Sequence, residues 1–473
     1  MADRIHAFAD DVLADHDAVA LAAMVRSGAV SPKELARAAI DRAALVEPQL
    51  NAIAYASVDR PRYASGRAGA WYGVPTFVKD NADVAGMPTN QGSAAFVARP
   101  AARDDAYTAQ FLSIGVTVLG KSRMPEFGLN PTTEFQAAEP TRNPWNPEYS
   151  VGGSSGGSAA MVAAGVVPVA HGNDGGGSLR IPAACAGLVA LKPSRYRHLD
   201  NVLDKHLPIR LISEGVLTRT VRDTAAYTAA AERYWRNPEL VPIGEVHGPA
   251  DRRLRIGLLT TAGTGAEPDA ETRGAVEFAA KLLERFGHQV EPMAVPFPPH
   301  LADDFLLYWA FLADMSAIGG KVLHGRSFDR HALDDLTRGL GRYHRERILR
   351  TPAALYRLRR AYRIYAEVFT RYELVLSPVV THVVPPLGYL DPKVPSEELI
   401  ERLRTYVGYT PIANVTGAPS LSMPTRIGSS GVPIGVMCSA AYGDERTLLE
   451  IGYLLEAENP FPRIDVEPTT QQV

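Results

Sequence analysis

Two glycine-rich segments that carry serines constrain this chain more than any other feature of its sequence. Residues 152–158 are Gly-Gly-Ser-Ser-Gly-Gly-Ser, and residues 172–182 are Gly-Asn-Asp-Gly-Gly-Gly-Ser-Leu-Arg-Ile-Pro. Apolar sequence follows each of them, at 159–170 and at 181–191, so we expect ordered loops between buried elements rather than a polar linker. Glycine lets backbone approach a ligand closely, and exposed N–H groups in such loops form a nest for negative charge. Serines among these groups predict a nucleophile beside an oxyanion hole.

A lysine upstream of both loops is the third candidate for this site. Residues 74–79 form a short apolar segment, typical of a buried strand, that ends in Lys79. An ammonium is costly to bury, and burial lowers its pKa until the neutral amine can act as a base. Taken alone, Lys79 would more simply be a surface lysine whose stem lies along apolar residues.

Lys79 and the two loops together resemble the amidase signature family. That family has a lysine after a strand, then Gly-Gly-Ser-Ser-Gly-Gly, then Gly-x-Asp-x-Gly-Gly-Ser-[Ile/Leu]-Arg-x-Pro. This chain keeps the order and the spacing, with 75 residues from Lys79 to Ser154 and 24 from Ser154 to Ser178. Further segments similar to the family are residues 121–128, 141–147, 187–193, 414–420 and 431–436. The resemblance covers roughly residues 15–460, with a weaker middle from about 195 to 410.

The resemblance assigns the family's Ser-Ser-Lys triad to Ser178, Ser154 and Lys79. It implies that Ser178 attacks the amide carbonyl and forms an acyl-enzyme. It also implies that Ser154, whose peptide bond is cis in the family, relays the proton to a neutral Lys79. Activity is then expected to rise toward alkaline pH, where the neutral amine is populated.

Supporting roles fall on residues of the same loops. The oxyanion hole is expected from four backbone N–H groups of the second loop, those of Gly175, Gly176, Gly177 and Ser178. Ser155 is expected to help hold Lys79. Asp174 and Arg180 are expected to pair across the loop and to keep the nucleophile in place.

A different serine hydrolase pattern also fits the first loop. Residues 153–157 match Gly-x-Ser-x-Gly with Ser155 as the nucleophile. That motif requires a strand before it, a helix after it, and an acid and a histidine downstream. None of the 12 histidines lies in a distinctive context. We therefore expect a chance match, and we interpret His171, just before the second loop, as a structural residue.

The composition is typical of an enzyme that needs no cofactor. A hydrophobic share of 46% is enough for a sizeable core, and a net charge of −3 indicates no polyanionic partner such as nucleic acid. Two cysteines, Cys185 and Cys438, are too few for a disulfide framework or a metal cluster. We find no nucleotide-binding motif, no signal peptide and no uninterrupted apolar run of about 18 residues. These features predict a cytoplasmic protein without a metal, an organic cofactor or a membrane partner; the resemblance also allows a homodimer.

Alternating helix and strand patterns predict an α/β protein. Helices are expected at 17–26, 31–45, 106–112, 158–164 and 271–286, and strands at 52–56, 74–79, 116–120, 166–170, 254–259 and 372–378. Such alternation favours a largely parallel sheet covered on both faces. The resemblance implies a single α/β/α domain around a central mixed sheet. Its expected parts are an N-terminal helical segment (1–70), a catalytic core (71–195), a variable region with substrate-channel helices (196–410) and a C-terminal part of the same sheet (411–473).

Specificity is expected from the variable region. Phe305, Tyr308 and Trp309 share one predicted helix, and they either line an apolar substrate tunnel or pack in the core. Asn130 and Thr132 are further candidates for contact with the substrate.

A stretch of eight arginines between residues 342 and 363 leaves a second function open. It predicts either a solvated helical face, which we favour, or a surface that contacts RNA. The RNA alternative matters because the amidase signature family includes the amide-hydrolysing subunit of the tRNA-dependent amidotransferase. The chain has no long basic tail, and residues 143–151 resemble stand-alone amidases more closely.

We therefore expect hydrolysis of linear or cyclic carboxylic amides to acid plus ammonia or amine, with esters also open. The amidotransferase subunit and a non-catalytic scaffold of this fold remain alternatives.

Overall fold

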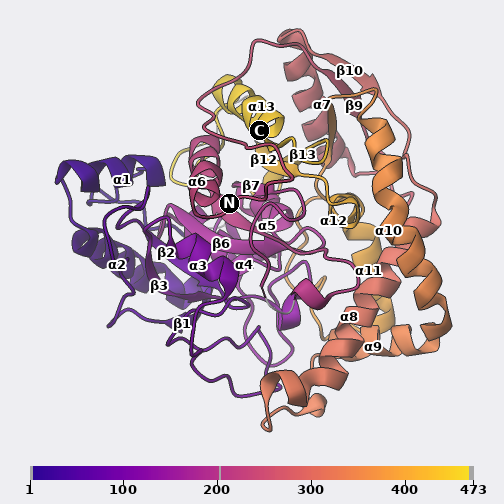
Figure 1. The fold of residues 1–473 in the computed structure, drawn as a ribbon, viewed down its shortest axis with the longest axis horizontal. Helices are drawn as coiled ribbons and strands as arrows, with labels where there is room; N and C mark the ends of the chain where they lie inside the picture. Colours follow the sequence, from indigo (N-terminus) through magenta and orange to yellow (C-terminus); the bar gives the residue numbers. More distant parts are fainter. Residues whose placement is uncertain (1–3, 202–203, 468–473) are drawn as a thin grey trace.

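The computed structural model describes residues 4–201 and 204–467, which form one α/β unit (Figure 1). Its centre is a sheet of eight strands in the order β10-β9-β11-β13-β12-β7-β8-β6. These strands are β6 (Val169–Asp174), β7 (Val189–Lys192), β8 (Ser213–Thr218), β9 (Arg255–Leu258), β10 (Gln289–Pro292), β11 (Leu374–Pro378), β12 (Ser420–Ile427) and β13 (Pro433–Ala440). Two smaller sheets contain β1 (Ile53–Ala56), β2 (Pro75–Lys79) and β3 (Thr117–Ser122), and β4 (Arg142–Asn143) and β5 (Asn146–Ser150).

The central sheet is mixed, as predicted, but it is not largely parallel. In the described chain only two neighbouring pairs, β10–β9 and β9–β11, run parallel, and the other pairs run antiparallel. The prediction was wrong because a helix between two strands does not make them neighbours. Helix α5 (Arg180–Ala186) connects β6 to β7, yet β8 lies between these strands and pairs antiparallel with both.

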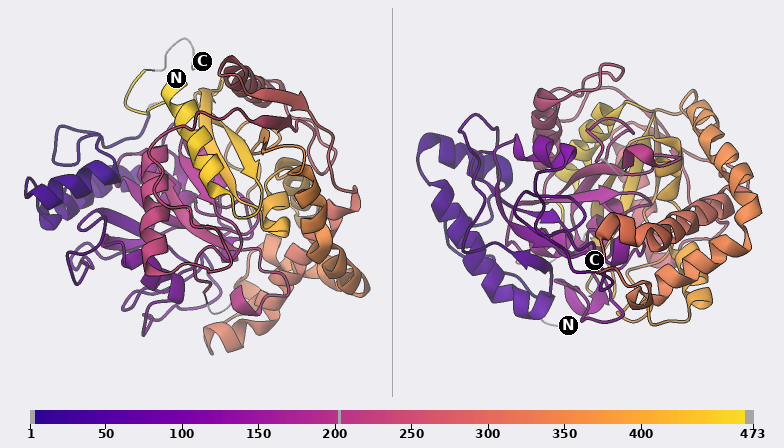
Figure 2. Two further views of the ribbon diagram at one scale, coloured as in Figure 1. Left: turned by 45° about the horizontal axis from the view of Figure 1, so that its top comes forward. Right: turned by 60° about the horizontal axis from the view of Figure 1, so that its bottom comes forward.

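Helices cover both faces of the central sheet (Figures 1 and 2). Helices α6 (Val221–Tyr234), α7 (Ala270–Arg285) and α13 (Glu445–Glu458) pack on one face, and α4 (Gly156–Ala163) and α5 pack on the other. The remaining α-helices are α1 (Ala18–Ser27), α2 (Pro32–Leu50), α3 (Ala106–Leu112), α8 (His300–His324), α9 (Asp335–Glu346), α10 (Thr351–Val368), α11 (Ser396–Tyr406) and α12 (Pro411–Thr416). Short 3-10 turns are η1 (Glu126–Gly128), η2 (Asp204–His206), η3 (Arg330–Ala332) and η4 (Ile348–Arg350). The predicted single domain with helices on both sides of a mixed sheet is therefore confirmed.

Local signals set the bounds of several elements. Ser31 and Glu34 form a capping box at the start of α2, which then runs to Leu50, beyond its predicted end at residue 45. Helix α3 has the predicted bounds. Strand β6 begins later than predicted, because the N–H groups of Val166 and Val167 bond to Met161 and complete the end of α4.

The two ends of the chain meet on the same part of the unit. Arg4 Nη1 donates to the carbonyl oxygens of Ile464, at 3.2 Å, and Val466, at 3.0 Å. The N-terminal and C-terminal segments therefore pack against each other.

Helices α8 to α11 form an outer layer beyond α5. Within the described residues, α8 is the one helix long and apolar enough by composition to cross a membrane. It packs against α9 and α10, and two of its aspartates are buried. Asp304 accepts hydrogen bonds from Arg357, and Asp314 bonds to His344. Buried aspartates with hydrogen-bond partners of this kind are typical of a helix that packs within a protein.

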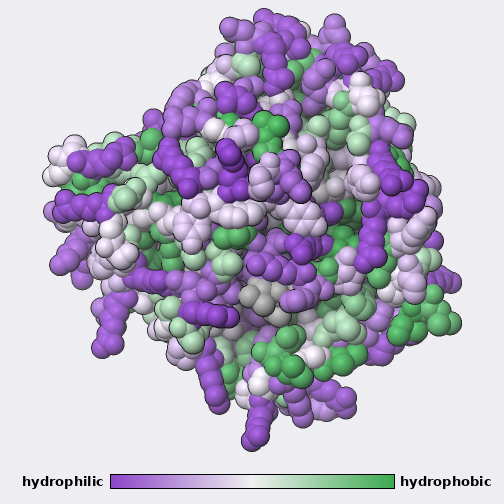
Figure 3. All heavy atoms as spheres, in the orientation of Figure 1, coloured by the Kyte–Doolittle hydropathy of each residue, from purple (hydrophilic) through white to green (hydrophobic). Residues whose placement is uncertain are grey.

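The outward side of α8 nevertheless carries exposed apolar residues, namely Met315, Ile318, Val322 and Leu323. In Figure 3 most of the surface is hydrophilic, and apolar atoms gather toward the lower edge, where the C-terminal end of α8 lies in Figure 1.

Candidate active site

The two serine loops meet where two helices of one layer begin. Ser154 and Ser155 directly precede α4, and Ser178 directly precedes the cap of α5. Because α4 and α5 pack against each other, their first turns bring the loops together. The N–H of Ser155 donates to the carbonyl oxygen of Ser178 at 3.3 Å, and Ser154 and Ser178 line one cavity. The peptide bond between Gly153 and Ser154 is cis.

Lys79 ends β2 and is completely buried. Its Nζ donates to Ser154 Oγ and to Asn173 Oδ1, each at 2.7 Å. Burial lowers the pKa of Lys79 to about 7, although the carboxylates of Glu214 and Asp174 oppose this shift. The amine can therefore lose its proton near neutral pH while it contacts a serine hydroxyl.

His171 accepts a hydrogen bond from the backbone of Lys79. The N–H of Lys79 donates to His171 Nδ1 at 3.2 Å, so Nε2 carries the ring proton and donates to Glu214 Oε2 at 2.9 Å. Burial, with nearby lysine charges, lowers the pKa of His171 to about 3, so the ring is neutral. The other Glu214 oxygen accepts from Asn201 Nδ2 at 2.9 Å. His171 thus has the structural role expected of it.

Glu214 was missed by the sequence analysis. It lies 4% exposed in β8, among uncharged buried residues, and a carboxylate in such a strand is the signal that could have found it. Burial raises the pKa of Glu214, although the charge of Lys79 opposes this. Glu214 is therefore the acidic group whose charge most directly affects the Lys79 amine.

Asp174 and Arg180 form a fully buried ion pair within the loop that carries Ser178. Nε and Nη2 of Arg180 donate to the two carboxylate oxygens, each at 2.9 Å. Burial alone would raise the pKa of Asp174, but Arg180 and the side chain of Asn414 lower it. Asn414, in α12, donates to Asp174 Oδ1 at 2.9 Å and accepts from Arg180 Nη2 at 2.7 Å. The C-terminal part of the chain thereby supports a loop more than 200 residues upstream.

Three of the four N–H groups expected in the oxyanion hole are free to bind a substrate oxygen. Gly177 is the exception, because its N–H donates to the carboxylate of Asp174 at 2.8 Å. Within the described chain, no hydrogen bond is formed by the N–H groups of Gly175, Gly176 or Ser178. The structure therefore removes Gly177 from the predicted set of donors, and the role of the other three stays a prediction.

Glycine is required at position 177 by the backbone itself. Its φ is +134°, and a Cβ there would lie 2.5 Å from Thr410 Oγ1. A side chain at position 177 would therefore displace the loop that carries Ser178.

Ser155 is linked to Lys79 only indirectly, because both residues form hydrogen bonds to Asn173. Its hydroxyl donates to the backbone oxygen of Asn173 at 3.3 Å, and no hydrogen bond joins it to Lys79 in the described structure. Ser155 is completely buried and lines neither cavity beside Ser178. A nucleophile must reach its substrate, so the geometry does not favour the Gly-x-Ser-x-Gly alternative.

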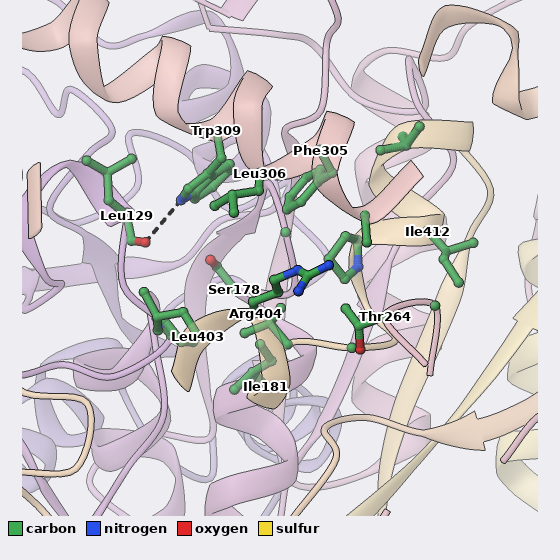
Figure 4. A pocket seen from close by; sticks show the side chains of 18 of the residues that line it. Leu129, Ser178, Ile181, Thr264, Phe305, Leu306, Trp309, Leu403, Arg404 and Ile412 are labelled. Atoms are coloured by element: carbon green, nitrogen blue, oxygen red, sulfur yellow. Dashed lines mark hydrogen bonds between the residues drawn. The ribbon is translucent and has the colours of Figure 1, made fainter. Parts of the chain in front are cut away.

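One cavity beside Ser178 is mostly apolar, although Thr264 and Arg404 also line it, and we call it the apolar cavity (Figure 4). Its walls come from η1, α5, α8, α11 and α12, and include Leu129, Ile181, Phe305, Leu306, Leu403 and Ile412. Trp309 also lines it, and its Nε1 donates to the Leu129 carbonyl oxygen at 3.1 Å. Asn130 lines it as well, and its Oδ1 is buried without a partner among the described residues. Three predicted substrate residues, Asn130, Phe305 and Trp309, therefore line the same cavity as Ser178.

Two other predicted substrate residues lie elsewhere. Tyr308 points into the core, where its hydroxyl donates to the Ile209 carbonyl oxygen at 2.7 Å. Consecutive helical residues point about 100° apart, so Tyr308 and Trp309 face different surroundings. Thr132 is fully buried, and its hydroxyl donates to Glu134 at 2.8 Å. Neither Tyr308 nor Thr132 lines a cavity that contains Ser178.

A second cavity is also lined by Ser178 and shares Gly128 and Trp309 with the apolar cavity, and we call it the polar cavity. Its walls include Asn81, Asp83, Arg103, Asp105, Ser154, Asn173, Asn201 and Asp204. The described part of the chain contains no group of three or more His, Cys, Asp or Glu side chains placed to hold a metal ion.

Comparison with known proteins identifies the family. The family model described as Amidase matches residues 34–449. The chain belongs to the amidase family. It is 46% identical to the putative amidase AmiC of Mycobacterium leprae, over 98% of this chain and 99% of that protein. It is 34% identical to the 6-aminohexanoate-cyclic-dimer hydrolase of Paenarthrobacter ureafaciens, over 94% of this chain and 95% of that protein.

A solved structure of a 6-aminohexanoate cyclic dimer hydrolase shares the fold of this amidase. The TM-score is 0.83 at 30% identity, and the match covers 97% of this chain and 99% of that one. The resemblance to the amidase signature family is thus confirmed over nearly the whole chain, and with it the assignment of this protein to the hydrolases that act on amides.

Proposed function

We propose that this amidase cleaves carboxylic amides with a Ser-Ser-Lys triad, in which Ser178 is the nucleophile, Ser154 the proton relay and Lys79 the base. The observation that carries the proposal is the buried hydrogen bond of 2.7 Å between Lys79 Nζ and Ser154 Oγ. Burial brings the pKa of this lysine to about 7, so a neutral amine is available to accept a proton at neutral pH.

Acylation moves one proton toward the lysine. Ser178 Oγ forms a bond to the amide carbonyl carbon while its proton passes to Ser154, whose own proton passes to Lys79 Nζ. The free N–H groups of the second loop stabilise the negative oxygen, at ~3–4 kcal/mol per donor in well-studied hydrolases. When the C–N bond breaks, the proton returns from Lys79 through Ser154 to the leaving nitrogen.

Deacylation repeats the path with water as the nucleophile. Water adds to the ester carbonyl, and its proton travels to Lys79 by the same relay. The ester bond then breaks, the carboxylic acid leaves, and Ser178 regains a proton. The sum of both steps is amide plus water to acid plus ammonia or amine, without a redox partner.

The first test measures acid and ammonia release from a panel of aliphatic, aryl and cyclic amides and esters. We expect turnover by the wild type and a loss of about a thousandfold or more in Ser178→Ala. A fluorophosphonate probe should label the wild type and leave the variant unlabelled. A wild type that labels but hydrolyses no member of the panel would favour the amidotransferase subunit; one that does not label would favour the scaffold.

The relay itself is tested with Lys79→Met, which keeps an unbranched side chain of similar length. We expect kcat/KM to fall by about 10²–10⁴. The melting temperature should not fall, because the buried ammonium is costly in the folded state. Lys281→Met, at an exposed lysine of α7, is the matched control. Near-normal activity of Lys79→Met at neutral pH would refute proton transfer from Ser154 to Lys79.

The cytoplasmic location, the homodimer and the absence of nucleic-acid and membrane partners stay predictions. Cell fractionation and the mass of the purified protein in solution would test them.

A further inference from the structure

A third cavity lies between α1 and α6, and we call it the α1–α6 cavity. It has a volume of about 400 Å³ and shares no lining residue with the apolar or the polar cavity. Its walls come from α6, from α1 and α13, which both pack against α6, and from residues 70–71 and 245–247 (Figure 1). A cavity of this size is large enough for a small organic molecule. None of the residues proposed for amide cleavage lines it, so a ligand there is not the reacting amide.

Much of the α1–α6 cavity is lined by small apolar side chains of the two helices. These are Val19, Ala22, Ala225, Ala226 and Ala229. Ala225 and Ala229 lie one turn apart on α6, so they present one apolar strip to the cavity. Apolar surface gains stability when a ligand removes it from water, so this lining favours a ligand with an apolar body.

Trp71 supplies a hydrogen-bond donor to this cavity. It lines the cavity and is only 2% exposed, and its Nε1 donates no hydrogen bond within the described residues. Nε1 of Trp145 and of Trp309, by contrast, each donate to a backbone carbonyl oxygen. Some unpartnered nitrogens of the described chain, such as Nε of Arg195, are fully enclosed, but Trp71 Nε1 is not one of them. A buried indole N–H usually has an acceptor, so this one points to a ligand that carries an acceptor.

One positive charge on the same wall has no acidic partner. Arg26, in the last turn of α1, forms no ion pair among the described residues, and its Nη1 donates to the carbonyl oxygen of Ala70 at 3.0 Å. Ala70 directly precedes Trp71, so the guanidinium lies beside the backbone of the residue that carries the free N–H.

The other two guanidiniums of the wall are paired. Arg222 forms an ion pair with Asp17 at 2.7 Å, and the charge of Asp223 acts on it as well. Arg233 forms an ion pair with Glu245 at 2.8 Å. The charge that these pairs leave without an offset is that of Arg26, which matches a ligand with a single negative charge.

We propose that the α1–α6 cavity is a second binding site, which takes an apolar monocarboxylate. One carboxylate oxygen accepts from Arg26 and the other from Trp71 Nε1, while the apolar body lies against the alanines of α1 and α6. A carboxylate suits this wall because its planar pair of oxygens matches a guanidinium. The site goes beyond the proposed function and does not depend on it, because none of its residues belongs to the proposed triad.

The indole N–H signals of the protein test the site directly. In protein labelled with ¹⁵N in its tryptophan side chains, Trp71→Phe and Trp309→Phe identify the two signals that report on the α1–α6 cavity and on the apolar cavity. We expect 4-phenylbutyrate to shift the Trp71 signal saturably, with half-saturation at about 1 mM or below. The uncharged 4-phenylbutanol should bind there about tenfold more weakly.

Three outcomes of this titration would overturn the inference. The first is a Trp71 signal that does not move up to about 20 mM 4-phenylbutyrate. The second is equal binding of the acid and the alcohol. The third is a shift of the Trp309 signal alone, which would place the acid beside Ser178 instead.

Two variants at exposed residues change the charge of the wall in opposite directions. Arg26→Met removes the cation without an acidic partner and should weaken 4-phenylbutyrate binding by about tenfold or more. Glu245→Gln removes the carboxylate that contacts Arg233 and His247, so binding should tighten by about twofold. Arg60→Met, at an exposed residue outside all three cavities, is the matched control and should bind as the wild type does. Unchanged affinity in Arg26→Met, or weaker binding in Glu245→Gln, would overturn the assignment of the carboxylate to this wall.

Discussion

The ammonium of Lys79 and the side-chain oxygen of Asn173 form a buried hydrogen bond of 2.7 Å. Asn173 is also the register partner of Glu214 across β6 and β8, and its side chain lowers the pKa of that carboxyl group against the effect of burial. Asn173 therefore lies between Lys79, the proposed base, and Glu214, whose carboxylate raises the Lys79 pKa. Because the asparagine is neutral, it orients the amine without adding a charge that would keep the amine protonated.

This position makes Asn173→Asp a sharp test of the base. A carboxylate at the same distance from Nζ would favour the ammonium, so the pKa of Lys79 should rise by about one pH unit or more. We expect the rising limb of kcat/KM against pH to move to higher pH, with a loss of about tenfold at neutral pH. Asn146→Asp, outside both cavities, changes the net charge equally and should leave the profile in place. A profile of Asn173→Asp that coincides with the wild type would contradict Lys79 as the titrating base.

Glu214→Gln should shift the pH profile in the direction opposite to that of Asn173→Asp, relative to the wild type. In the proposed mechanism the neutral Lys79 amine is the active form, so kcat/KM should be low below the Lys79 pKa of about 7, rise through it and level off above it. The charge of Glu214 raises the Lys79 pKa, so its removal should move the rising limb to lower pH.

A matched control for this experiment is Glu139→Gln at an exposed residue, whose profile should coincide with that of the wild type. A wild-type profile that is flat from pH 5 to 9, or a shift of Glu214→Gln to higher pH, would refute the assignment.

The apolar cavity predicts a dependence on acyl chain length. The Phe305 ring packs beside Trp309, with centroids 5.7 Å apart, and lies against the backbone of Gly176. Phe305→Ala should reduce the preference for hexanamide over acetamide by about tenfold, since each methylene in an apolar pocket changes kcat/KM by roughly that factor. The comparison is made on kcat/KM for both amides in one preparation.

Tyr308→Phe is the matched control on the same helix. Its hydroxyl bonds the backbone of Ile209 and faces neither cavity, so the chain-length preference should remain while the melting temperature falls. An altered preference in Tyr308→Phe, with none in Phe305→Ala, would mean that the acyl group binds elsewhere.

We expect the loop that carries Ser178 to depend on Arg180 for stability. Arg180→Met would leave the buried carboxylate of Asp174 without its cation, at a cost of about 3–5 kcal/mol in the free energy of unfolding. Denaturant unfolding measures this cost. Arg37→Ala breaks an exposed pair with Asp41 and should have little effect. Equal small losses in both variants would show that the Asp174 pair does not hold the loop.

Many residues of this candidate site could be predicted because they lie together in short segments of the sequence. The residues of each loop are neighbours along the chain, so Ser154, Ser178 and the Asp174–Arg180 pair could be found without a fold. Helix α3 was also predictable to its last residue, since helix bounds follow from local patterns. The order of the strands was not, because a strand's neighbours depend on which edges remain open when the sheet assembles; β8 enters between β6 and β7 for that reason.

Long-range packing decided what surrounds the proposed triad. Asn414 meets Asp174 from α12, and Glu214 meets His171 from β8, although neither belongs to a local motif with its partner. Tyr308 and Trp309 are adjacent in sequence, yet only the packing of α8 determined which one lines the cavity.

The sequence by itself determined the proposed reacting groups and their order along the chain, because backbone conformation and loop chemistry depend on near neighbours. The tertiary structure alone decided the burial of Lys79, the occupied N–H of Gly177 and the division of the space around Ser178 into an apolar and a polar cavity. Burial, the pKa values that depend on it and the shape of a cavity arise from segments distant in sequence that exclude water together. No short stretch of sequence contains that information.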